Sequence, residues 1–170
     1  MYKKIMLVSL LIGSFTGCKN YSVSLNDRTV YMPAGVFKDF QIADVALAEC
    51  VTQTIYDLNI TKAEDLTRLN CSEAGIKDLN GLDKFFALKE LNLSSNKIHN
   101  IEALNKLGRL EILFLQNNKI VRIEPLLNLL HLKQINLSNN SITDCKNLKQ
   151  LKTNLHDNKA EFAYGNQCSF

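Results

Sequence analysis

The sequence lacks a strong charge of either sign and an apolar run long enough to span a bilayer. It has 20 basic and 17 acidic residues among 170. Two of the lysines lie in the leader described below, so the rest of the chain is close to neutral. A nearly neutral chain lacks the excess of basic residues that is typical of nucleic-acid-binding proteins, so we expect no nucleic-acid partner. The main apolar stretch, from Ile5 to about Phe15, is shorter than the roughly 20 residues that a spanning helix needs.

Motifs of catalysis, cofactor binding and metal binding are also missing. The sequence contains no nucleophile elbow, no phosphate-binding loop and no His-Glu-x-x-His stretch. The three histidines, His99, His131 and His156, lack partners at metal-ligand spacing, so we interpret them as surface residues. Carboxylates are scattered, and nothing predicts an acid–base pair. We therefore expect no enzyme, no cofactor and no metal site, and a function carried by a surface.

A 22-residue repeat organises the middle of the chain. Leu66, Leu88, Leu110 and Leu132 open the runs LTRLNCSEAGIKDLNGL, LKELNLSSNKIHNIEAL, LEILFLQNNKIVRIEPL and LKQINLSNNSITDCKNL. Apolar residues at the first, fourth and sixth places alternate with polar ones, which predicts a short strand with one buried face. A fixed period of about 20–29 residues is typical of a solenoid, whose stacked units share one continuous core.

The ninth place of three repeats holds an asparagine: Asn96, Asn118 and Asn140. An amide pointing inward there can bond backbone groups that are freed as the chain leaves the strand. Ala74 replaces it in the first repeat, which marks that repeat as terminal. Two further apolar rows predict tight helical turns on the outer side, namely Ile76, Ile98, Ile120, Ile142 and Leu82, Leu104, Leu126, Leu148.

These motifs resemble those of the leucine-rich repeat family, from Leu66 to about Leu151. The short form LxxLxLxxNxIxxIxxLxxL is similar to the repeats of internalins and of cytosolic phosphatase-regulating proteins. The resemblance implies an α/β solenoid with a curved parallel β-sheet, short helical or 3-10 turns on the convex side, and an N-terminal helical cap. Because the matching residues are structural, the resemblance implies a fold and not a particular activity.

Residues 1–17, MYKKIMLVSLLIGSFTG, have the features of a secretory signal peptide. Lys3 and Lys4 precede the apolar stretch, an arrangement typical of such leaders. An exported protein is therefore expected.

The end of this leader, Phe15-Thr16-Gly17-Cys18, resembles the lipobox of bacterial lipoproteins. In that family a small residue precedes a cysteine that is lipidated and becomes the mature N-terminus, although Phe15 stands where Leu is usual. The resemblance implies a lipid anchor on Cys18 in the bacterial cell envelope. Lys19 does not resemble the aspartate that retains such proteins at the inner membrane, which favours the outer membrane in a Gram-negative cell. The alternative is an ordinary signal peptide that is cleaved nearby.

Four cysteines remain if Cys18 is lipidated, and an even number in an exported chain predicts two disulfides. Cys71 belongs to the first repeat and Cys145 to the last, so they lie at opposite ends of the array. Cys50 precedes the array and Cys168 follows it. The local pairings are therefore Cys50–Cys71 and Cys145–Cys168, whereas any other pairing would cross the solenoid. Four buried free thiols are the alternative.

Five segments are expected: a signal peptide at 1–17, a polar tether at 18–35, an N-terminal helical cap at 36–65, four repeats at 66–153 and a C-terminal cap at 154–170. Apolar spacing from Phe37 to about Leu47 or Val51 predicts one amphipathic helix or two short ones in the first cap. Thr61-Lys62-Ala63-Glu64 fits a capping box for a further short helix. Caps cover the open ends of the core.

Strand alternation exposes the third, fifth and seventh places of each repeat on the inner sheet. These places are polar except on the third strand, which has Ile112 and Phe114. Large apolar groups ringed by polar ones are typical of interface anchors, so this pair predicts the centre of a partner-binding patch. Its polar rim would consist of Glu90, Asn92, Gln134 and Asn136. The alternative is that the two side chains merely pack on each other.

The sequence thus favours a lipid-anchored binding module of the envelope, which would hold a protein or a glycan on its concave sheet and would be a monomer. The alternative is a structural or regulatory lipoprotein that supports an envelope complex. An intracellular regulator, like some repeat relatives, conflicts with the signal peptide.

Overall fold

The computed structural model describes the chain at residues 23–25, 28–31, 35–157, 159–165 and 168. The predicted signal peptide and the predicted lipidation site Cys18 lie outside these residues.

The chain divides into two compact units, Met1–Ala34 and Gly35–Phe170. In the first unit, β1 (Val23–Leu25) pairs with β2 (Arg28–Tyr31) in an antiparallel arrangement. The sequence had indicated only a polar tether in this segment, because two strands of three and four residues leave no clear periodic pattern.

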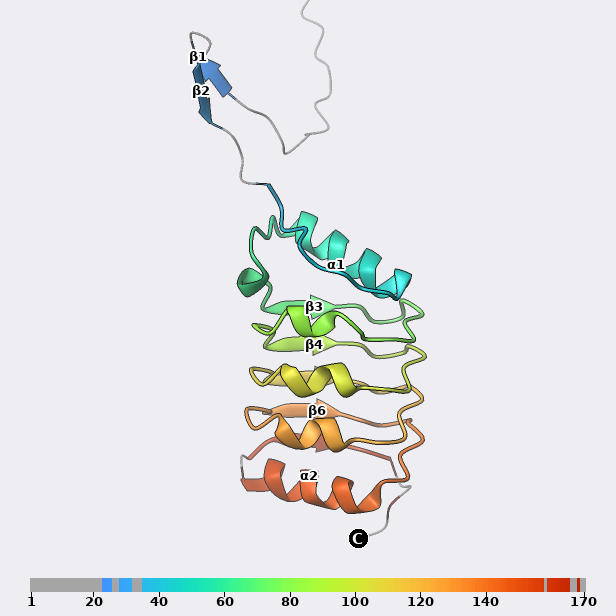
Figure 1. Ribbon diagram of the computed structural model, residues 1–170. Helices are drawn as coiled ribbons and strands as arrows, with labels where there is room; N and C mark the ends of the chain where they lie inside the picture. Colours follow the sequence, from blue (N-terminus) through green and yellow to red (C-terminus); the bar gives the residue numbers. More distant parts are fainter. Residues whose placement is uncertain (1–22, 26–27, 32–34, 158, 166–167, 169–170) are drawn as a thin grey trace, which may run out of the picture. The chain divides into compact units, whose positions relative to one another are not determined.

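Five parallel strands form the sheet of the second unit (Figure 1). They are β3 (Arg68–Asn70), β4 (Glu90–Asn92), β5 (Ile112–Phe114), β6 (Gln134–Asn136) and β7 (Glu161–Ala163). From β3 to β6, equivalent places of successive repeats are partners, as in the row Arg68, Glu90, Ile112 and Gln134. The solenoid with a parallel sheet that the repeat predicted is confirmed.

The fifth strand, β7, was not predicted. Its residue Glu161 pairs with Gln134 of β6 in parallel register, and these residues are 27 apart in the chain. The longer spacing arises because a full helix, α2 (Cys145–Asp157), replaces the short turn of the earlier repeats. The 22-residue period therefore ends before the strand that completes the sheet.

Short 3-10 turns connect the strands on the outer side (Figure 1): η1 (Ala63–Asp65), η2 (Leu82–Lys84), η3 (Glu102–Lys106) and η4 (Glu124–Asn128). Between them and the sheet lies one continuous core of leucine and isoleucine rows. Leu88, Leu110 and Leu132, for example, are fully buried. Each row is contributed by successive repeats, so no repeat buries its apolar face alone.

Three buried asparagines tie neighbouring repeats together. Nδ2 of Asn118 donates to the carbonyl oxygens of Leu93 and Leu115, at 2.9 and 3.0 Å, and its Oδ1 accepts from the N–H of Ile98 at 3.1 Å. The corresponding bonds are made by Asn96 and Asn140. One side chain thus satisfies backbone groups of two repeats, as the ninth-place pattern predicted.

The N-terminal cap is built around α1 (Val45–Asp57), whose buried face consists of Leu47, Val51 and Ile55. The predicted helical start at Phe37 is wrong: residues 35–42 are irregular, and the rings of Phe37 and Phe40 pack against Phe85. The spacing of Phe37 and Phe40 therefore reflects their packing on Phe85 and not the period of a helix.

The capping box expected at Thr61 does not form either. The turn η1 begins after Lys62 without a side-chain cap. Thr61 instead contacts the carboxylate of Asp65, at 3.4 Å.

Asp44 joins the cap to the first repeat. Its Oδ1 accepts from the N–H of Leu47 at 3.1 Å, which caps α1, and its Oδ2 accepts from the N–H groups of Lys77 and Asp78 at 2.8 and 3.1 Å. Partial burial of the carboxyl opposes its ionisation, but the backbone donors, Lys77 foremost, outweigh this effect and lower the pKa of Asp44. A carboxylate held by several N–H groups favours its charged form.

We expect Asp44→Ala to lower the free energy of unfolding by about 2 kcal/mol, because a helix cap and two charge-assisted bonds are lost together. A carboxyl with a lowered pKa in the folded state stabilises above its ordinary value of 3.8, and that stabilisation disappears as the pH falls through the lowered value. Urea unfolding at about pH 7 and about pH 3 measures both effects. A difference between wild type and variant that stays constant with pH would contradict this role.

Two disulfides fasten the caps. Cys50 of α1 is bonded to Cys71 beside β3, and Cys145 at the start of α2 is bonded to Cys168. The predicted pairing is confirmed, and each bond joins a cap to an end of the array.

Candidate binding groove on the concave sheet

An open hollow of about 510 Å³ lies over the inner face of the sheet. Strands β3 to β6 form its floor, and the C-terminal end of α1 contributes to one side. Its lining consists of Thr54, Asp57, Leu58, Arg68, Leu69, Asn70, Glu90, Leu91, Asn92, Ile112, Phe114 and Gln134. We call this hollow the concave groove.

Ile112 and Phe114 occupy the middle of this floor on β5. Both are half-buried, while Leu113 between them is fully buried in the core. This alternation follows from the period of two in a strand, which turns successive side chains to opposite faces. The two side chains therefore face the concave groove and do not fill the core.

Five of the six residues predicted for partner binding line the concave groove, and Asn136 does not. Two of the rim residues also have bonds within the protein. Oδ1 of Asn92 accepts from the N–H of Ser94 at 3.0 Å, and Nε2 of Gln134 donates to Glu161 at 3.0 Å. Glu90 is exposed. The rim is thus partly fixed before any partner arrives.

Phe114 stands at a place where the other three repeats have an asparagine. The fifth place of the other repeats is asparagine, and Asn70, Asn92 and Asn136 each accept a bond from the N–H two residues onward, at 3.2, 3.0 and 3.0 Å. Such Asx bonds stabilise the turn that follows a strand. Phe114 offers no acceptor to the N–H of Gln116. The third repeat therefore gives up a local stabilising bond for an aromatic ring on the groove floor.

The α1 residues of the groove were missed by sequence reasoning. Leu58, the residue that ends the helix, is 58% exposed, and it joins Ile112 and Phe114 as a lining apolar residue that is not buried. Asp57 accepts from Gln53 at 2.8 Å and gives this end of the groove a negative charge near Arg68. Only the docking of α1 onto β3 brings these residues to the sheet, so no local motif marks them.

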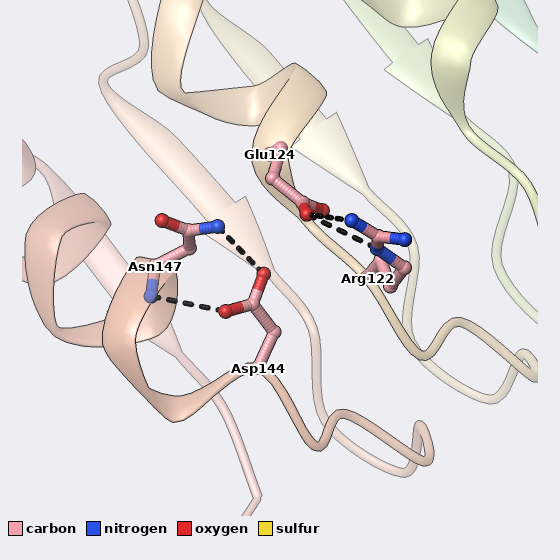
Figure 2. A network of polar contacts seen from close by, with 4 residues as sticks. All are labelled: Arg122, Glu124, Asp144 and Asn147. Carbon is pink, nitrogen blue, oxygen red and sulfur yellow. Dashed lines mark hydrogen bonds and ion pairs between the residues drawn. The ribbon is translucent and has the colours of Figure 1, made fainter.

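A polar network lies outside the groove, where the repeats give way to α2 (Figure 2). Asp144 accepts from the N–H of Asn147 at 3.3 Å and from its side chain at 2.7 Å, which caps the helix. Beside it, Arg122 is paired with Glu124 at 2.6 Å. The bond from Arg122 is the main cause of the lowered pKa of Glu124.

Among the described residues, neither a metal site nor a membrane-spanning helix accompanies the groove. His99, His131 and His156 are exposed, and no three His, Cys, Asp or Glu side chains in the described part of the chain gather where they could hold a metal ion. None of the described helices combines the length and apolarity that crossing a membrane requires.

Comparisons with known proteins agree with this architecture. The family model described as leucine-rich repeats in two copies matches residues 87–128 and 108–150. No curated protein matches the chain in sequence.

Among solved structures, an internalin (inlF) of Listeria monocytogenes has a TM-score of 0.62 at 27% identity, covering 73% of this chain and 37% of its own. The functional domain of InlJ from the same species, which includes a cysteine ladder, has a TM-score of 0.51 at 23% identity, covering 62% of this chain and 26% of its own. This chain spans well under half of either. The repeats and these structures show that the chain has a leucine-rich repeat fold similar to that of internalins.

Proposed function

We propose that this protein is a lipid-anchored binding module of the bacterial cell envelope, which holds a protein partner in the concave groove. The observation that carries the proposal is the replacement of asparagine by Phe114 on the groove floor. An aromatic side chain that is half exposed, flanked by Ile112 and surrounded by polar groups has the properties of an interface anchor. A glycan is the alternative partner. The module needs no catalytic group, cofactor or nucleic acid.

The proposed location in the cell envelope rests on the sequence and is supported by the disulfides. Disulfides persist in oxidising compartments outside the cytoplasm, and both bonds here fasten caps. The signal peptide at 1–17 and the lipobox-like Phe15–Cys18 supply the export signal and the anchor. Lys19 favours the outer membrane in a Gram-negative cell.

The anchor predicts that Cys18→Ser abolishes labelling of the protein with radioactive palmitate and releases it from membranes washed at high salt. Stable anchoring needs more than a single acyl chain, so loss of the modified residue removes all of it. Ser22→Ala is the matched control, because it leaves the lipobox and both disulfides intact. A Cys18→Ser protein that is still processed and still sediments with membranes washed at high salt, which weakens electrostatic contacts, would refute the anchor.

The groove predicts that Ile112→Gln combined with Phe114→Asn weakens partner binding by about 1–3 kcal/mol, as the loss of central anchors does. These substitutions copy Gln134 and Asn136 of β6, which the fold already accommodates. The free energy of unfolding should therefore change by less than about 1 kcal/mol.

The experiment captures partners from envelope extracts and measures the affinity of the purified pair, with urea unfolding alongside. The matched control is Val121→Ala, an exposed apolar residue outside the groove. Lost stability with intact affinity would mean that Ile112 and Phe114 are structural only, and the proposal would fail.

A further inference from the structure

A second surface, separate from the concave groove, lies at the edge of the solenoid where the chain enters strands β4, β5 and β6. There, four charged side chains and a histidine line a hollow of about 350 Å³: Lys89, Arg109, Glu111, Lys133 and His131. Lys89, Glu111 and Lys133 each come immediately before a strand. Because parallel strands lie roughly 4.8 Å apart, these residues of successive repeats stand side by side. We call this surface the basic edge.

Positive charge is in excess on the basic edge. Glu111 is its one carboxylate, and it is shared: Lys133 donates a hydrogen bond to it and Lys89 lies 3.8 Å away. The guanidinium of Arg109 is 6.0 Å from the centre of the Phe86 ring and forms a cation–π contact. Three full cations thus face one anion. The side chains of Lys89 and Lys133 are 55% and 71% exposed, so both are accessible to a partner.

Two exposed large apolar side chains lie beside residues of this hollow: Phe86 contacts Arg109, and Leu130 directly precedes His131. Phe86 is 42% exposed and Leu130 is 65% exposed. Phe86 stands three residues before Lys89, and Leu130 stands three residues before Lys133. Glu64 and Asp65 occupy the equivalent places one repeat toward the N-terminal cap. The apolar and basic surface therefore ends there.

We propose that the basic edge is a membrane-contact surface, which rests on a bilayer containing anionic phospholipids. Lysine and arginine near such a surface are attracted to its phosphates, while apolar and aromatic groups enter the interface between headgroups and acyl chains. Charge complementarity alone would also suit a soluble polyanion. That partner, however, would leave Phe86 and Leu130 in water, whereas a bilayer receives them. The contact would orient the solenoid on the membrane and does not depend on a lipid at Cys18.

The test uses the unit Gly35–Phe170, which contains the whole core cluster, from Leu47 to Cys168, and both disulfides. It therefore folds on its own, and it lacks Cys18, so an acyl anchor cannot contribute. Co-sedimentation is measured with vesicles of phosphatidylcholine alone and with vesicles of equal parts phosphatidylcholine and phosphatidylglycerol. We expect binding to the second kind only, weakening as salt is added.

Variants locate the contact. Lys89→Gln with Lys133→Gln should weaken vesicle binding about 25-fold, since one basic residue near an anionic surface contributes roughly fivefold. Glu111→Gln should strengthen it about fivefold by the same reasoning. Leu130→Ser should weaken binding without changing its salt dependence. The matched control, Lys97→Gln with Lys119→Gln, removes two exposed lysines from the turns that follow β4 and β5.

Equal loss in the Lys97 and Lys119 control would overturn the proposal, because attraction would then be general. So would equal binding to neutral vesicles. Tight binding of soluble heparin at the basic edge without any vesicle binding would assign the surface to a soluble polyanion instead. The groove variant Ile112→Gln with Phe114→Asn should bind vesicles as the wild type does, so this test and that of the proposed function can fail separately.

Discussion

Asn118→Ala is expected to lower the free energy of unfolding by about 3 kcal/mol. The substitution removes two donors to the carbonyls of Leu93 and Leu115 and the acceptor of the Ile98 N–H. All of these bonds are buried, and a buried polar group without a partner costs about 1–3 kcal/mol. Water cannot replace the lost bonds, because Asn118 is only 7% exposed.

Urea unfolding measures this loss, and Asn105→Ala is the control. Asn105 is an exposed asparagine on η3 that accepts one bond from Asn128, so its replacement should cost less than about 0.5 kcal/mol. Equal losses for the two variants would mean that the buried amides do not hold the repeats together.

Removing the disulfide Cys50–Cys71 is expected to destabilise the protein by about 3 kcal/mol, according to the chain-entropy model for a loop of this size. The bond closes 21 residues and joins α1 to the edge of the array. Without it, α1 is held by its apolar face and by Asp44. The helix should therefore open locally before the repeats do.

Hydrogen exchange on Cys50→Ser with Cys71→Ala measures that opening. Amide protection should fall in α1 and persist in β4 to β6. The mirror-image control is Cys145→Ser with Cys168→Ser, which should loosen α2 and β7 and leave α1 protected. Uniform loss of protection in both variants would show that the unit opens as a whole, against the view of caps as separate closing elements.

The repeat array could be predicted from sequence because each of its features recurs. A leucine at every twenty-second position and an isoleucine at the eleventh place recur in all four repeats, and an inward asparagine recurs in three. The pairing of the cysteines followed from the same register, since the repeats place Cys71 and Cys145 at opposite ends.

Features that occur once were not predicted. Strand β7 follows a unit of 27 residues, so its phase differs from that of the other strands. The start of α1 was misplaced because Phe37 and Phe40 pack on Phe85 and not along a helix. The contribution of Asp57 and Leu58 to the concave groove depends on how α1 docks, a tertiary contact that has no local sequence pattern. Ile112 and Phe114, by contrast, could be identified from the sequence, because the other repeats have polar residues at the same two places.

The most direct test of the central claim is photo-crosslinking in the native envelope. A benzophenone amino acid is placed at position 114 in one version of the full chain and at position 121 in another. Val121 is 39% exposed and lies outside the concave groove. If the groove holds the partner, irradiation should give a discrete crosslinked protein from position 114 and none from position 121. A crosslinked protein from position 121, with none from position 114, would contradict the account and move the binding surface away from the concave sheet.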